Sequence, residues 1–203
     1  MQAFFMLKWY QSKIDKMNNK KLINLLFEFG QLYRIKHEGW RLIGIENPKS
    51  VADHGLRAAQ IGYFLARMEK YQDPYQIVTM LVFHDMGECR IGDIHKVANR
   101  YVQANEEKAV EEQLSPLKKE GEELMELWKE TETQNTKAGA IAKDADLLEH
   151  AITAKEYLEK GYKYAENWIK NVEKKLKTKS AKILLQTLKK ADSNEWWQGL
   201  KKI

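Results

Sequence analysis

Apolar residues recur every three or four positions along most of this chain, and no segment shows the sustained period-two alternation that a β-strand requires. Residues 20–36 show the helical pattern clearly, with Leu22, Leu25, Phe29 and Leu32 on one face. The 203 residues include only 3 Pro and 11 Gly, and these fall between the periodic segments. We therefore expect an all-α fold, a compact helical bundle.

Capping residues indicate where individual helices begin. Ser50 with Asp53 three residues later predicts the start of a helix whose small residues permit close packing. Asp73 and Pro74 predict the start of the next helix, which we expect to extend to about Glu88. The remaining expectations are a loop over residues 38–49, a polar helix over 105–131 that Ser115 and Pro116 can interrupt, a helix over 137–160, and two short helices at the end.

Charge is distributed unevenly along the chain. The net charge is +5, but residues 155–203 contain 13 Lys against 6 Asp or Glu, so residues 1–154 carry a net charge of −2. Such a segment can bind nucleic acid or an anionic membrane, but exposed lysines more often keep amphipathic helices soluble. We favour the solvated face and expect neither a nucleic-acid nor a membrane partner. Its lysines are Lys174, Lys175, Lys177, Lys179 and Lys182.

Several classes of protein are disfavoured by what the sequence lacks. The single cysteine, Cys89, excludes an intramolecular disulfide and a multi-cysteine zinc cluster. No stretch approaches the roughly 20 apolar residues of a membrane span, and the apolar run at residues 3–7 is too short for a signal peptide. We therefore expect a cytoplasmic protein. The GxGxxG, GxxxxGK and GxSxG patterns are absent, which argues against kinase-like enzymes and serine hydrolases.

Ionisable residues that interrupt an apolar helix are the candidates for chemistry, because such groups are rarely placed there without partners. His84 and Asp85 follow a mostly apolar run. Glu88 comes four residues after His84 and therefore shares its helical face, and Asp93 follows a glycine. This cluster indicates a metal or catalytic site.

Further ligands for a metal ion must come from elsewhere in the chain. His54 lies among small residues, which suits a side chain that must approach another helix. Asp146 interrupts an Ala- and Leu-rich face, although Asp144 or Glu149 could instead be the inward-facing carboxylate. Two imidazoles and two carboxylates suit Mn, Fe, Co, Ni or Zn far better than calcium.

The order His54, His84-Asp85, Asp146 resembles the H…HD…D signature of the HD-domain metal-dependent phosphohydrolases. The segments ENPKSVADH, HDMGECRIGDI, EEKAVEEQL, LWKETETQNT and KDADLLEHA extend the similarity to the 5′-deoxynucleotidase branch of that family. The similarity covers about residues 20–160. It implies one HD domain over residues 1–203, with this core and the Lys-rich C-terminal helices packed on or beside it.

The resemblance also implies a role for each matching residue. The metal ligands would be His54, His84, Asp85 and Asp146, holding one divalent transition metal ion (Co, Mn, Zn, Fe or Ni). The catalytic residues would be Glu88 and Asp93, and the substrate-binding residues would be Trp40, Arg41, Ile94, His95 and Lys96.

One position departs from the family pattern. Bacterial members place an arginine that orients the phosphate directly before this tryptophan, whereas here Gly39 precedes Trp40. The phosphate contact is therefore open, and Trp40 could be a packing residue instead. The basic candidates for the phosphate contact are Arg34, Lys36, His37, Arg41 and Lys96.

By this resemblance, the chain is expected to be a phosphomonoesterase that hydrolyses (deoxy)nucleoside 5′-monophosphates, and to form a homodimer. A triphosphate, an alarmone or a cyclic nucleotide is the alternative substrate, although few cationic residues lie near the dyad. A helical module that binds nucleic acid would explain the charge but not the His and Asp cluster. Aromatic residues near both ends, Phe4, Phe5, Trp9, Trp196 and Trp197, offer apolar surface for the dimer.

Overall fold

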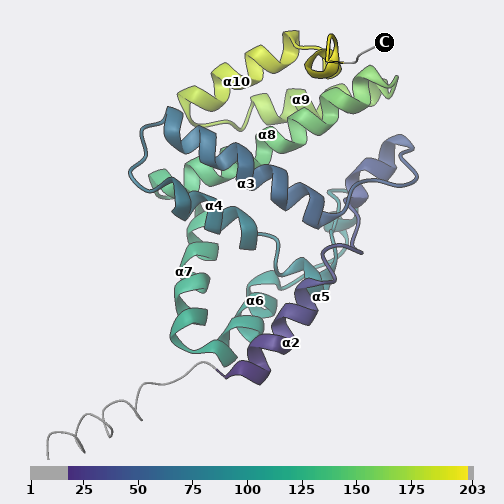
Figure 1. Ribbon diagram of the computed structural model, residues 1–203. Helices are drawn as coiled ribbons and strands as arrows, with labels where there is room; N and C mark the ends of the chain where they lie inside the picture. The colour runs from purple at the N-terminus through teal and green to yellow at the C-terminus, as the bar shows by residue number, and fades with distance from the viewer. Residues whose placement is uncertain (1–17, 201–203) are drawn as a thin grey trace, which may run out of the picture.

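The computed structural model describes residues 18–200, and Figure 1 shows a bundle of α-helices joined by turns and by longer connecting segments. The α-helices are α2 (Asn19–Phe29), α3 (Val51–Met68), α4 (Pro74–Phe83), α5 (Glu88–Ile91), α6 (Glu106–Leu114), α7 (Lys119–Thr133), α8 (Lys137–Glu159), α9 (Glu166–Glu173) and α10 (Lys179–Lys190). The 3-10 helices are η1 (Glu38–Ile43), η2 (Ala98–Arg100), η3 (Ser115–Leu117), η4 (Lys163–Ala165) and η5 (Glu195–Trp197). No strand occurs within residues 18–200, which confirms the all-α prediction.

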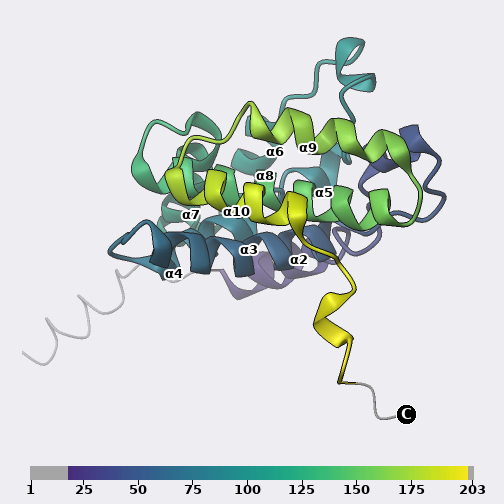
Figure 2. The same cartoon turned by 90° about the horizontal axis from the view of Figure 1, so that it is seen from above.

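Helix α8 is the central element and packs against α3, α4, α7, α9 and α10. Small and branched apolar residues are buried on several of its sides, so it has no wide solvent face. Helices α9 and α10 lie along α8 at one end of the molecule, whereas α2 and α6 lie at the other (Figures 1 and 2). The hydrophobic core is therefore built around α8.

Helices α3 and α4 pack closely because α3 presents the small residues that the sequence indicated. Ala58 and Ala59 are buried in the core. A Cβ atom at Gly62 would lie 2.2 Å from Cδ1 of Leu81, so only glycine fits this contact without a shift of the neighbouring side chain.

The predicted caps are present. The Ser50 hydroxyl accepts a hydrogen bond from the Asp53 N–H at 3.1 Å, and the Asp53 carboxylate accepts one from the Ser50 N–H at 2.9 Å. The Asp73 carboxylate accepts hydrogen bonds from the first-turn N–H groups of α4. The predicted break near Ser115 is also found, because η3 separates α6 from α7.

Three predicted boundaries are wrong. Helix α2 ends at Phe29 rather than near residue 36, and the chain then continues through consecutive turns. Helix α4 ends at Phe83 rather than near Glu88, because hydrogen bonds from other elements hold the following residues in a turn. The expected loop over 38–49 contains η1, since burial of Trp40 stabilises a helical turn that the glycine and proline content concealed.

The C-terminal helices join the main core. Ile169 and Val172 of α9 and Leu185 of α10 are buried in the same cluster as the α8 residues. The five lysines that the sequence assigned to a solvated face are all exposed. Within residues 18–200, no helix is both long enough and apolar enough to cross a membrane.

Candidate metal centre and active site

The turn that carries His84 and Asp85 is held by side chains of α6 and α7. Trp128 of α7 donates a hydrogen bond from its indole Nε1 to the His84 carbonyl oxygen at 2.9 Å. Gln113 of α6 donates to the Met86 carbonyl oxygen at 3.0 Å, and the Met86 side chain is buried. The position of the dyad is thus fixed by packing far from it in sequence.

Four side chains from three helical regions converge beside this turn. His54 Nε2 lies 3.2 Å from His84 Nε2 and 3.2 Å from Asp146 Oδ1. Asp85 Oδ2 lies 3.1 Å from His84 Nε2 and 3.7 Å from His54 Nε2. The structure therefore brings together all four residues that the sequence indicated as metal ligands.

The donor atoms fit a divalent transition metal ion. His84 Nδ1 lies 2.7 Å from the Leu81 carbonyl oxygen, which can only accept, so Nδ1 carries the proton and Nε2 offers a lone pair. His54 Nδ1 lies 2.5 Å from Glu149 Oε2, which favours the same tautomer. The Nε2 lone pairs of the two histidines then face the carboxylates of Asp85 and Asp146. A bound cation would relieve the repulsion between these electron-rich groups.

The charges around Asp146 keep its carboxylate ionised. Burial alone would raise the pKa of Asp146, but Lys143, His150 and His54 hold it well below its usual range. Burial lowers the pKa of His54, yet hydrogen bonds to Asp146 and Glu149 outweigh it and raise that pKa to about 9. This cluster attracts a positive charge, which a metal ion can supply in place of a proton.

The three acidic residues of α8 that the sequence could not separate have different surroundings. Asp144 accepts hydrogen bonds from the N–H groups of Lys177 at 3.0 Å and Thr178 at 2.6 Å, away from the histidines. Glu149 contacts Nδ1 of His54, the ring nitrogen that points away from His84. Asp146 is therefore the one that faces the two Nε2 atoms.

Glu88 and Asp93 lie near the ligands at the two ends of α5. Glu88 Oε2 is buried without a hydrogen-bond partner, and burial with the charges of Asp85 and Asp93 raises the pKa of Glu88 to about 10. Gly92, with a φ of 73°, allows the chain to turn so that Asp93 accepts the Glu38 N–H at 2.6 Å. Burial also raises the pKa of Asp93. Both carboxyl groups are suited to hold and transfer protons.

These groups line a cavity of about 420 Å³, large enough for a small ligand. Of the residues expected to contact substrate, Ile94, His95, Lys96 and Trp40 line it. Arg41 does not: its guanidinium pairs with Glu38 and donates to the Glu46 carbonyl oxygen. Among the other basic candidates for the phosphate contact, His37 lines the cavity, whereas Arg34 and Lys36 are not in its wall.

Trp40 is 1% exposed and its ring stacks on that of Trp168, with centroids 4.8 Å apart and an interplanar angle of 24°. Tyr157 packs edge-on against the same ring at 5.1 Å. Much of the Trp40 ring is thus engaged in packing, as the alternative interpretation of this residue expected.

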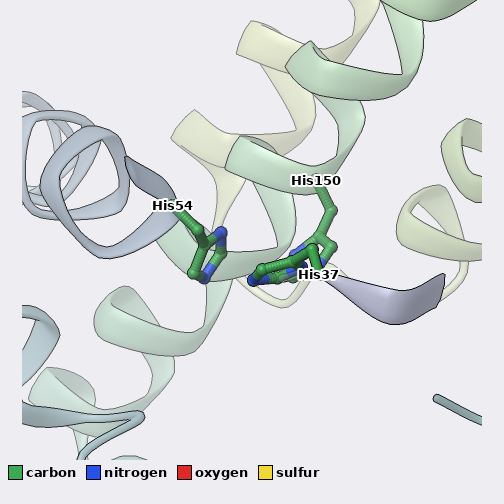
Figure 3. Close-up of side chains that lie close together, drawn as sticks. All are labelled: His37, His54 and His150. Atoms are coloured by element: carbon green, nitrogen blue, oxygen red, sulfur yellow. The ribbon is translucent and has the colours of Figure 1, made fainter. Parts of the chain in front are cut away.

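Some residues of the site were not singled out from the sequence. Figure 3 shows His150 of α8 beside His54 and His37, with ring centroids between 4.6 and 5.2 Å apart. Lys143 pairs with Asp146 at 2.8 Å. Helical spacing could have indicated both His150 and Lys143. His150 lies four residues after Asp146 and Lys143 three residues before it, so both share its helical face. No comparable spacing in the sequence indicates the cavity residues of the α9 region, which are Asn167, Trp168, Asn171 and Lys175.

Comparisons with known proteins agree with this geometry. A family model described as HD domain matches residues 29–189. The 5′-deoxynucleotidase HDDC2 of Dictyostelium discoideum is 35% identical over 151 residues, covering 70% of this chain and 79% of that protein. The bovine 5′-deoxynucleotidase HDDC2 is 33% identical over 142 residues, 68% of each chain.

Solved structures give the same result. A conserved hypothetical protein from Pyrococcus furiosus has a TM-score of 0.69 and 31% sequence identity, covering 83% of this chain and 99% of that one. The region that the HD-domain family model matches, residues 29–189, includes the four candidate metal ligands and the carboxylates of Glu88 and Asp93. The chain therefore belongs to the HD-domain family, in the branch that contains the 5′-deoxynucleotidases HDDC2.

Proposed function

We propose that this protein is a metal-dependent phosphomonoesterase that hydrolyses (deoxy)nucleoside 5′-monophosphates to a nucleoside and inorganic phosphate. The observation that carries the proposal is that His54, Asp85, Asp146, Glu88 and Asp93 line one cavity, with His84 against His54 and Asp85 behind its wall. The relatives named 5′-deoxynucleotidase supply the substrate class.

The roles of the residues follow from their surroundings. His54, His84, Asp85 and Asp146 would hold the metal ion, which when bound polarises a phosphate oxygen and lowers the pKa of water. Glu88 or Asp93 accepts the proton of the attacking water as its oxygen bonds to phosphorus. The other carboxyl group donates a proton to the 5′ oxygen as the P–O bond breaks.

We further propose one divalent metal ion per chain, drawn from Co, Mn, Zn, Fe and Ni. The mixed nitrogen and oxygen donors favour this group over calcium. The protein is proposed to act in the cytoplasm.

A homodimer is also proposed. Trp196 is 75% and Trp197 is 38% exposed, which leaves apolar surface for a contact between copies. The sequence also suggested three N-terminal aromatic residues for the dimer contact. These lie outside the described residues: Phe4, Phe5 and Trp9.

The test is a phosphate-release screen of the metal-loaded protein over deoxy- and ribonucleoside 5′-monophosphates, triphosphates, alarmones and cyclic nucleotides. We expect release from monophosphates. Glu88→Gln should lower turnover about 100-fold or more through loss of acid–base assistance, with metal content unchanged. The control is Glu111→Gln, an exposed glutamate of α6, which should behave like wild type.

Three results would contradict the proposal or part of it. Phosphate release from triphosphates, alarmones or cyclic nucleotides alone would replace the substrate class. Full activity of Glu88→Gln would remove Glu88 from the reaction. Absence of hydrolysis together with binding of nucleic acid would favour the non-catalytic alternative.

A further inference from the structure

Three lysines line the cavity that contains the candidate metal ligands: Lys96, Lys143 and Lys175. Lys143 is balanced, because its Nζ lies 2.8 Å from Asp146 Oδ2. Among residues 18–200, no carboxylate lies within 4.0 Å of the ammonium group of Lys96 or Lys175. Two cations therefore face the cavity without a counter-ion.

These two lysines come from distant parts of the chain and lie side by side. Lys96 follows Asp93 after α5, and Lys175 lies in the turn after α9, where its N–H donates to the Val172 carbonyl oxygen at 2.8 Å. Burial and the adjacent Lys96 charge lower the pKa of Lys175. Neighbouring like charges repel, so a bound anion between them is favourable.

Helix α9 anchors the turn that carries Lys175 to the core. Ile169 and Val172 are buried in the core cluster beneath this helix. Asn167 and Asn171 line the cavity at four-residue spacing, and Lys175 comes four residues later. Helix α9 and the turn after it thus contribute polar groups to the cavity wall.

We propose that Lys96 and Lys175 together form the subsite that binds the phosphate group of the substrate. Both line the same cavity as Asp85 and Asp146, so one phosphate can meet the metal position and the lysines at once. Lysine binds phosphate as a compact point charge, and two lysines match the two negative charges of a phosphomonoester. That this phosphate belongs to a nucleoside 5′-monophosphate rests on the proposed function.

The first experiment measures the kinetics of Lys96→Gln and Lys175→Gln with a nucleoside 5′-monophosphate that the wild type hydrolyses. Each variant should raise KM about 10-fold or more, because a charge-assisted hydrogen bond to the substrate is lost. The matched control is Lys174→Gln, which removes the same charge from the adjacent residue, outside the cavity wall, and should leave KM unchanged.

The second experiment does not depend on turnover. Binding of inorganic phosphate to the metal-loaded proteins is measured by calorimetry at fixed ionic strength. Lys96→Gln and Lys175→Gln should weaken binding about 10-fold relative to Lys174→Gln. The double variant should lose less than the product of the two single losses, since both lysines hold one anion.

The two experiments separate this inference from the proposed function. If wild type hydrolyses monophosphates but Lys175→Gln keeps its KM and phosphate affinity, the subsite is refuted and the function stands. If no monophosphate is hydrolysed but phosphate binding still requires both lysines, the anion subsite stands and the function is refuted. Equal losses in all three single variants would indicate only a long-range charge effect and would also overturn the subsite.

Discussion

Glu149 does not face the proposed metal position, yet it determines how His54 is presented to it. Its side chain is fully buried and its Oε2 lies 2.5 Å from His54 Nδ1. Lys49 contacts the other oxygen, and Arg57 donates to it at 2.9 Å. The hydrogen bond and charge of His54, with the charges of Lys49 and His150, hold the pKa of Glu149 well below its usual range against the effect of burial, so the carboxylate stays ionised.

We predict that Glu149→Gln weakens Co²⁺ binding about 10- to 100-fold, the usual effect of losing a carboxylate that orients a ligand histidine. A chelator competition assay measures this, with circular dichroism to confirm that the variant is folded. Glu156→Gln is the control, because Glu156 pairs with Arg57 but does not contact His54. Wild-type Co²⁺ affinity in folded Glu149→Gln would remove this role.

The sequence indicated residues that the structure brings together, although their roles as ligands stay a prediction. His54, His84 and Asp85 were indicated by ionisable groups in apolar or small-residue surroundings, and the structure places their side chains together. The residues by themselves left Asp144 and Glu149 open as alternatives to Asp146, and the family resemblance was needed to choose Asp146, because α8 is buried on several sides. In the structure, the packing of α10 against Asp144 separates it from Asp146.

At the level of elements, the end of α4 decides where the His-Asp dyad lies. The apolar pattern continues past Phe83 and predicted a longer helix, but hydrogen bonds from other elements override it. Trp128 donates to the His84 carbonyl oxygen, which stabilises the turn instead of another helical turn. Contacts between distant residues of this kind cannot be deduced from the local sequence.

Trp128→Phe keeps an aromatic ring but removes the indole N–H. The buried His84 carbonyl oxygen then loses its partner, so we expect the free energy of unfolding to fall by about 1–3 kcal/mol. Metal affinity should fall as well, because the turn that carries two ligands is less firmly held. Urea denaturation and a metal titration test both effects.

The control for this change is Trp197→Phe, which alters a partly exposed indole whose N–H lies 3.4 Å from Asn194 Oδ1. It should change stability by less than about 0.5 kcal/mol. A Trp128→Phe protein as stable as this control would show that the hydrogen bond does not hold the turn.

For the molecule as a whole, the C-terminal helices α9 and α10 pack on the main core, and residues of α9 line the cavity. The HD family model reaches residue 189, whereas the sequence motifs extended only to about residue 160. Helix α9 packs on α8 and completes the cavity wall. The amphipathic pattern of the sequence predicted these helices. It did not show which lysines face the cavity, because a lysine at a polar position of the pattern can face either a cavity or solvent.

A carboxylate links the first long helix of this core to the last. Glu69, at the C-terminal end of α3, accepts a hydrogen bond from the Ser180 N–H of α10 at 2.8 Å. A negative charge at a helix N-terminus is stabilising by about 0.3–1 kcal/mol. The hydrogen bonds to Ser180 lower the pKa of Glu69 below its ordinary value of 4.5, so the folded state favours the ionised form.

We predict that Glu69→Gln lowers the free energy of unfolding at pH 7 by about 0.5 kcal/mol, within the range for helix-terminus charges. Because the folded pKa lies below the ordinary 4.5, the contribution is complete above that pH and is lost as the pH falls through the folded value. The difference between wild type and Glu69→Gln should therefore narrow in acid. Urea denaturation from pH 7 to the lowest pH at which both proteins fold measures it, with Glu195→Gln as an exposed control. A difference that stays constant over this range would mean that the link between α3 and α10 does not depend on the charge.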